Sequence, residues 1–420
     1  MSDVEIVHPV PVDEVESWAE SMAITFVDFE PNEQAQRQLE GLRRDWLPDR
    51  FWGARDDGQW VGTLGAWPRT LSVPGTDTTI PADALTMVTV ATTHRRRGLL
   101  TTMLTESLHA ARDRGDAVSI LWAAEWPIYW RFGYAPASLS AGYILKTRGP
   151  GAFLDGDRGG PLRRVDAEEF GTLAPDIFAR ASVQRAGNID RPDSWWKRTL
   201  GLDGYPKDAF DEKRPVRLVH EGPDGPDGYL AWRPGGKGFD IDGSMATVTV
   251  TDLCAATESA YRGIWSFLLA MDVVGQVEIG RRPVDEPVRW LLRDGRALRQ
   301  EYAGDALWLR LLDVPAALSA RRYAVSDRLT FEVVDDDIGG FAAGRYVLEG
   351  APDGAKCLPS TVDTPELRVH QRALAAAYLG GTSLHSQAIA GRIDELSAGA
   401  LRRADAMFAT PMAPWCATGF

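Results

Sequence analysis

A buried strand, a turn rich in arginine and an amphipathic helix follow one another in this chain of 420 residues, in the segment LTMVTVATTHRRRGLLTTML. The apolar run from Leu85 predicts the strand. The leucine spacing after Gly98 predicts one face of a helix that stops near Gly115. The run AVSILWA, which starts at Ala117, predicts a second buried strand. This order indicates a βαβ unit with three arginines at its turn.

The turn before this helix is suited to bind an anion. The first N–H groups of a helix have no partner within it, and they lie at the positive end of the helix dipole. Arg95, Arg96 and Arg97 add charge and forked donors, and Gly98 lets a ligand approach the backbone closely. A pyrophosphate fits such a turn. The alternative is a solvated basic patch beside a helix.

The chain is long enough for about three domains of ~150 residues. In the first, apolar residues from Val15 to Phe26 have helical spacing, and Asp57-Gly58 lies where a hairpin turn is expected. Glycine and proline crowd residues 146–161 and mark a boundary. We expect an α+β protein with domains at residues 1–148, 149–303 and 304–420.

The second domain contains a weaker copy of the first motif. The segment TVTVTDLCAATESAYRGIWSFLLAMDVVGQVEI again has a strand, a short turn, an Arg-Gly pair and an apolar helix. Aligning Gly98 with Gly263 places Arg97 on Arg262 but Arg96 on Tyr261. The second copy therefore has lost cations, and we expect it to be catalytically silent.

Composition argues against several classes of partner. The formal charge of −13 disfavours nucleic acid, which needs a basic face, and suits a cationic substrate or simply a soluble surface. The three cysteines and six histidines lack the spacing of a metal site or disulfide framework. The acidic N-terminus is unlike a signal peptide, and no apolar run has the length of a membrane span. We expect a cytoplasmic protein without metal.

The arginine turn resembles a known family. VTVATTHRRRGL is similar to motif A of the GCN5-related N-acetyltransferases (GNAT), whose Q/R-x-x-G-x-G/A loop holds the pyrophosphate of acetyl-CoA. Arg95 and Gly98 fit this pattern, whereas Leu100 stands at its last G/A position. Together with IYWRFGYAPAS, the turn resembles the narrower Eis (enhanced intracellular survival) acetyltransferases of actinobacteria. AYRGIWSFLLAMD, AAAYLGG, AIAGRI and APWCATGF extend the resemblance over the whole chain.

The resemblance implies both an architecture and an activity. The architecture is a catalytic GNAT domain, a degenerate second GNAT domain and a C-terminal domain similar to sterol carrier protein, assembled as a homohexamer. The activity is acetyl transfer from acetyl-CoA to primary amines of aminoglycosides or similar polyamines, or to lysine side chains. Two other classes stay open: an acyl-CoA-binding protein without turnover, and a lipid-binding module.

The resemblance also implies which groups do the chemistry. Backbone amides near Val88 and Val90 would bind the thioester oxygen and the pantetheine arm. Tyr129 would be the acid, because a phenol of pKa ~10 stays protonated at pH 7 and can donate to a thiolate whose conjugate acid has a pKa of ~8.5. Tyr134 is a competing phenol in the same segment. The general base would be the main-chain carboxylate of Phe420.

Aromatic and acidic side chains are candidates for the amine pocket. By analogy with the family, Phe26 and Asp28 in ITFVDFE would contact the substrate, although surface or packing roles fit them as well. Trp195 and Trp196 could form an aromatic wall of this pocket or pack in the core of the second domain. For the pocket we name Trp196.

Overall fold

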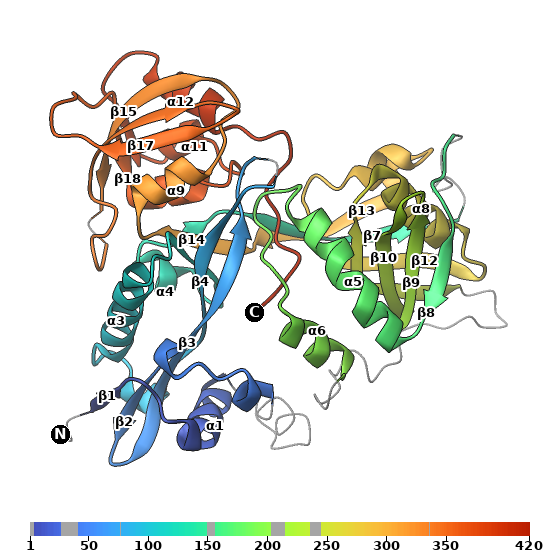
Figure 1. The fold of residues 1–420 in the computed structure, drawn as a ribbon, viewed down its shortest axis with the longest axis horizontal. Helices are drawn as coiled ribbons and strands as arrows, with labels where there is room; N and C mark the ends of the chain where they lie inside the picture. The colour runs from blue at the N-terminus through green and yellow to red at the C-terminus, as the bar shows by residue number, and fades with distance from the viewer. Residues whose placement is uncertain are drawn as a thin grey trace.

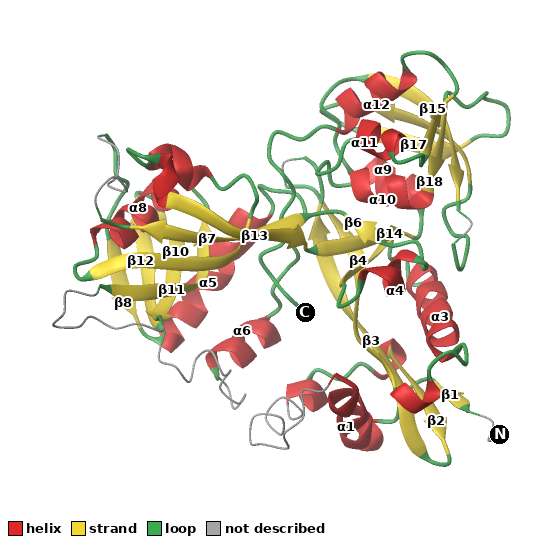
Figure 2. Cartoon of the chain, turned by 180° about the vertical axis from the view of Figure 1, so that it is seen from behind, coloured by secondary structure: helices red, strands yellow, loops and turns green. Residues whose placement is uncertain are grey.

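The computed structural model describes residues 4–26, 41–75, 77–148, 156–202, 215–235, 245–335 and 337–420. Asp28 lies outside the described residues. In this part of the chain, two seven-stranded sheets and one five-stranded sheet each form the centre of a lobe (Figure 1). Helices and sheets are mixed in every lobe, as the predicted α+β class requires (Figure 2). No helix within these ranges is long and apolar enough to cross a membrane.

The first lobe is built on a sheet with the strand order β1-β2-β3-β4-β5-β14-β6. The predicted hairpin joins β2 to β3, with Asp57 at φ 46° and Gly58 at φ 78°, the positive values that a tight hairpin turn needs. The helices α1 (Val15–Phe26), α3 (Leu99–Asp113) and α4 (Trp126–Trp130) belong to this lobe. Its strands are β1 (Glu5–Val7), β2 (Phe51–Asp56), β3 (Gln59–Ser72), β4 (Thr79–Val90), β5 (Val118–Trp122), β6 (Ala135–Pro136) and β14 (Leu307–Leu311).

The second lobe is built on a sheet with the order β13-β7-β12-β11-β10-β9-β8. Three helices pack with it: α5 (Ala167–Ser182), α6 (Asp193–Leu200) and α8 (Glu258–Ala270). Its strands are β7 (Leu139–Lys146), β8 (Leu162–Val165), β9 (Val216–Gly222), β10 (Gly225–Pro234), β11 (Ala246–Ala255), β12 (Val274–Arg282) and β13 (Leu298–Asp305).

Strand pairing crosses both expected domain boundaries. β7 comes from residues 1–148 but pairs with β12 and β13 in the second sheet. β14 comes from residues 304–420 but lies between β5 and β6 in the first sheet. All five positions of β14 are buried, including Arg310. Buried backbone N–H and C=O groups need hydrogen-bond partners, and β5 and β6 pair with this strand on its two edges. The first two lobes are therefore interlocked.

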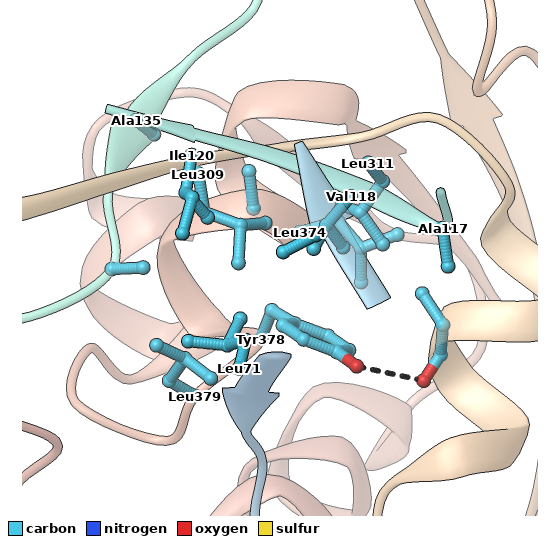
Figure 3. Packing of buried hydrophobic residues seen from close by; sticks show 14 of the residues in the cluster. Leu71, Ala117, Val118, Ile120, Ala135, Leu309, Leu311, Leu374, Tyr378 and Leu379 are labelled. Carbon is cyan, nitrogen blue, oxygen red and sulfur yellow. Dashed lines mark hydrogen bonds between the residues drawn. The ribbon is translucent and has the colours of Figure 1, made fainter. Parts of the chain in front are cut away.

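The third lobe shares a hydrophobic core with the first (Figure 3). Leu374 on α10 and Tyr378 pack against Ile120 of β5 and Leu309 of β14, and the Tyr378 hydroxyl donates to Ala317 O at 2.9 Å. The sheet order of this lobe is β17-β16-β15-β18-β19. The elements are α9 (Val314–Ala320), β15 (Asp327–Val334), β16 (Gly344–Gly350), β17 (Ala355–Pro359), β18 (Leu367–His370), α10 (Gln371–Ala377), α11 (Leu384–Ile389), β19 (Ile393–Glu395) and α12 (Ala400–Phe408).

The alignment of Gly98 with Gly263 is wrong in three dimensions. Gly98 is the N-cap of α3, at the end of a connection that spans residues 91–98. Gly263 is instead buried inside α8, whose N-cap is Thr257. Only Ala256 and Thr257 separate β11 from α8, so the second lobe has no room there for an anion-binding turn.

Candidate active site

The site begins where two parallel strands separate. β4 and β5 pair only from Ala82 opposite Val118 to Ala84 opposite Ile120. β4 then continues to Val90, away from β5. In an open α/β sheet, a gap at the carboxyl ends of neighbouring strands is where ligands bind.

A cavity of about 980 Å³ lies at this gap, a volume at the upper end of those typical for ligand pockets. It extends from β4 across the turn to the first residues of α3, and from α4 to the end of the chain. The lining brings together most of the predicted site residues. Those that it contains are Phe26, Val88, Val90, Arg95, Arg96, Gly98, Tyr129 and Phe420.

A β-bulge in β4 faces this cavity. Thr63 of β3 pairs with Thr89 and Gly65 with Thr86, so that Leu64 opposes two residues, Met87 and Val88. Met87 adopts φ 55°, and its carbonyl accepts the Thr63 hydroxyl at 2.7 Å. Such a conformation is strained by roughly 1–3 kcal/mol, and a bulge takes a residue out of the ladder. The bulge therefore makes backbone groups of β4 available beside the cavity.

The turn before α3 has the geometry of an anion site. Arg96 and Gly98 adopt φ 65° and 82°, so the chain reverses sharply before the helix begins at Leu99. No side chain of the described residues caps the helix at Gly98. The first amides of α3 thus lack the usual side-chain acceptor and lie at the cavity lining. His94 anchors the turn to β2 through a 2.9 Å contact between Nε2 and Asp56 Oδ2.

Only two of the three arginines reach the cavity. Arg95 and Arg96 line it, whereas the guanidinium of Arg97 donates to Thr93 O at 3.4 Å, within the turn. The structure therefore does not bring Arg97 to the predicted site, because consecutive residues in a sharp turn point in different directions.

The two tyrosines occupy different environments. Tyr129 on α4 lines the cavity and is 8% exposed. Burial raises its pKa to about 12, and the negative charge of Glu125 adds to this shift. Tyr134 is fully buried, and its hydroxyl lies 2.6 Å from Ser119 Oγ inside the lobe. The geometry favours Tyr129 as a group that touches a ligand.

The third lobe holds the segment that carries Tyr129. The next residue, Trp130, lies beneath two guanidinium groups, those of Arg372 at 5.1 Å and Arg392 at 4.5 Å from the ring centre. Buried Arg310 on β14 donates to Phe132 O. Arg372 and Arg392 thus hold α4 from the third lobe, and Arg310 holds the chain just after α4 from within the first sheet.

Comparison with known proteins identifies the family. Residues 7–137 and 187–311 each match the acetyltransferase (GNAT) domain, and residues 314–417 match the sterol carrier protein domain. The N-acetyltransferase Eis of Mycobacterium tuberculosis is 32% identical over 369 residues, 85% of each chain. The chain belongs to the Eis-like family of GCN5-related N-acetyltransferases.

Other relatives agree with this Eis-like assignment. An uncharacterized N-acetyltransferase of Streptomyces griseus is 36% identical over 375 residues, 87% of this chain and 88% of the relative. The crystal structure of Eis1 from Mycobacterium abscessus has a TM-score of 0.85 and 32% identity, with full coverage of both chains. A GCN5-related N-acetyltransferase from Kribbella flavida, at 21% identity and a TM-score of 0.80, shares the fold.

The Eis-like family fixes the general activity. The chain is an acetyltransferase that transfers an acetyl group from an acyl-CoA co-substrate to an amine. The uncapped start of α3, with Arg95 and Arg96 beside it, fits the pyrophosphate of such a co-substrate. Among the described residues, no three His, Cys, Asp or Glu side chains lie close enough to hold a metal ion.

Besides Arg97, two features of the Eis-like site differ from the sequence analysis. Trp196 is 3% exposed and packs against Phe170, Phe178 and Tyr229 in the second lobe, so the core-packing alternative describes it. Trp122 lines the cavity and was not predicted. Its position could have indicated this, because Trp122 is the last residue of β5 and strand ends border the gap.

Proposed function

We propose that this protein acetylates primary amines of aminoglycosides or similar polyamines, or of lysine side chains, by direct attack on the thioester of acetyl-CoA. The observation that supports this most is the shared cavity, in which an anion-binding turn, a protonated phenol and the chain end lie together. Phe26 and the exposed carboxylate of Glu125 in the same lining suit a cationic, partly apolar acceptor.

The proposed reaction needs one acid and one base. The amine nitrogen forms a bond to the thioester carbon, the carbon–sulfur bond breaks, the amine loses a proton and the thiolate gains one. Tyr129 donates to the thiolate, while the carboxylate of Phe420 orients the amine and takes up its proton through water. Amides near Val88 and Val90 donate to the thioester oxygen and hold the pantetheine arm.

One assay tests this function: release of free thiol from acetyl-CoA by untagged protein, across a panel of aminoglycosides, linear polyamines and lysine peptides. We expect release with at least one polyamine class and acetylated product in the mass spectrum. If no amine of the panel supports release while calorimetry detects acyl-CoA binding, the proposed acceptor classes are wrong. A lipid retained in native mass spectrometry would favour the lipid-binding module.

Neutralising the two arginines at the cavity is expected to weaken acetyl-CoA binding. Each charge-assisted hydrogen bond contributes roughly 1.5–3 kcal/mol, less where water screens it. In the double variant Arg95→Gln and Arg96→Gln, the KM for acetyl-CoA should therefore rise about 10–100-fold with little change in kcat. Arg97→Gln is the matched control, because Arg97 lies outside the lining. Equal effects in both would contradict the site.

The pH dependence of kcat should follow the phenol of Tyr129. Since burial raises its pKa to about 12, the proton that it donates is present below that pH and is lost only as pH rises through it. We therefore expect kcat at saturating amine not to decline between pH 7 and pH ~10. An ordinary tyrosine would begin to ionise at the upper end of this range. A decline centred near pH 8 or 9 would exclude Tyr129 as the acid.

The proposal extends to assembly and location. We propose a homohexamer, which sedimentation at micromolar concentration tests. We also propose that the protein acts in the cytoplasm. The burial of Cys254, Cys357 and Cys416 as free thiols supports a reducing compartment.

A further inference from the structure

The end of the chain is bound along its length by the second lobe. Residues 413–420, which we call the tail, follow α12 and run between the lobes to the cavity (Figure 2). One segment between α5 and α6 of the second lobe, residues 185–191, meets the tail at successive positions, and it also pairs with β3 of the first sheet through Ile189 opposite Leu71. The bonds are Arg185 Nε to Ala413 O at 2.6 Å, Trp415 N–H to Ala186 O at 2.9 Å, Ala417 N–H to Asn188 Oδ1 at 3.0 Å and Arg191 Nε to Thr418 Oγ1 at 2.9 Å.

A second segment, residues 281–285, holds the other side of the tail. The indole of Trp415 donates to Arg281 O at 2.8 Å, and the guanidinium of Arg282 lies 4.8 Å from a ring centre of the same tryptophan. Asp285 Oδ2 accepts the N–H of Ala413 at 2.9 Å. The tail is thus hydrogen-bonded to the second lobe on both sides.

The binding place corresponds to the ligand gap of the first lobe. β11 and β12 pair in parallel only as far as Val250 opposite Ile279, and then separate as β4 and β5 do. In the second lobe, Arg282 occupies this gap, paired with Glu286 at 2.6 Å and bonded to Leu253 O at 3.2 Å. The degenerate copy therefore presents protein groups where the catalytic copy has a cavity, and the tail packs on them.

Arg191 is the innermost of these contacts. Its side chain is 3% exposed and lies 4.0 Å from the ring centre of Phe178. The guanidinium also donates to Asp252 Oδ2 at 2.6 Å and to the Tyr229 hydroxyl at 2.9 Å. A planar guanidinium fixed in this way directs its Nε–H along one line, a geometry that lysine cannot reproduce. That donor meets Thr418, which is 2% exposed and precedes Phe420 by two residues.

We propose that the second lobe is the receptor for the tail, and that Arg191 is a positioning residue that sets where Phe420 lies in the cavity through Thr418. The inference rests on the proposed function in one respect, the catalytic use of the Phe420 carboxylate. The placement of the tail by Arg191 can be tested without it.

The test compares Arg191→Lys and Thr418→Val with the untagged wild-type protein. The first readout is the rate at which a carboxypeptidase releases Phe420, which we expect to rise at least 10-fold in both variants. The second is kinetic: kcat should fall about 10-fold while the KM for acetyl-CoA stays within 2-fold. Thr330→Val is the matched control, since Thr330 is a buried and hydrogen-bonded threonine of the third lobe. The Thr418 hydroxyl accepts from Arg191, whereas the Thr330 hydroxyl donates to Thr364 O at 2.9 Å.

The outcomes separate the placement of the tail by Arg191 from the catalytic role of the Phe420 carboxylate. Faster release without a loss of kcat supports the receptor and contradicts the catalytic role of the carboxylate. Unchanged release in folded Thr418→Val protein overturns the proposal, as does an equal loss of kcat in Thr330→Val. In protein that lacks Phe420, Thr418→Val should cause no further loss of kcat, and an additional loss would show that Arg191 acts by another route. If Arg191→Lys does not fold, Thr418→Val alone decides.

Discussion

The variant Tyr129→Phe is expected to lower kcat about 100-fold or more and to leave the KM for acetyl-CoA within about 2-fold. General acids contribute typically 10²–10⁴-fold to a rate, and the ring, which packs in the hydrophobic cluster behind the cavity, is retained in the variant. Steady-state thiol release at saturating amine measures the effect.

Tyr134→Phe is the matched control, since it makes the same change in the same segment. It removes the bond of 2.6 Å to Ser119, which should cost about 1 kcal/mol of unfolding free energy and lower Tm slightly. Because this phenol lies inside the lobe, kcat should stay within about 2-fold. If Tyr134→Phe showed the large loss and Tyr129→Phe did not, the two roles would have to be exchanged.

Moving the terminal carboxylate is expected to have a comparable effect. Two glycines added after Phe420 keep the ring but displace the charged group, and deletion of Phe420 removes both. Either change should lower kcat about 100-fold, the size expected for loss of a general base. The rate is measured with the amine that gives the highest turnover in the panel.

Phe420→Leu separates the ring from the carboxylate. It keeps an apolar side chain at a half-buried position and leaves the charge at the same point of the chain. We expect it to lose far less activity than either tail variant, about 3-fold, because the ring only anchors the tail. Full activity in the extended protein would show that the carboxylate takes no part in the reaction.

Local patterns predicted much of the site. The helix after Gly98, the hairpin at Asp57-Gly58 and the strand that ends in Trp122 follow from periodicity and turn chemistry within short windows. The turn before α3 follows too, because its amides and arginines are consecutive in the chain, and its binding of an anion stays a prediction. The family resemblance supplied Tyr129, which the structure places in the cavity.

Features that depend on distant residues were not predictable in this way. The run LWLRL at β14 is apolar enough to pair with any open edge, so nothing local assigns it to the first sheet. The bulge at Met87 depends on the register against β3. Neighbouring tryptophans such as Trp195 and Trp196 occur both in cores and in ligand pockets, and only the packing of Trp196 shows that it belongs to the core. Gly263 matched the Arg-Gly pair of the first motif but lies inside a helix.

The position of β14 has a consequence for how the protein is made. β5 and β6 both pair with β14 and lie on either side of it, so the sheet that carries the cavity stays incomplete until residue 311 has left the ribosome. The second lobe is synthesised in the interval, and β7 already ties it to the first. A fragment cut after residue 148 would leave an unpaired strand edge and could not mature on its own. Residues 1–148 therefore do not contain all the strands of the sheet that carries the cavity.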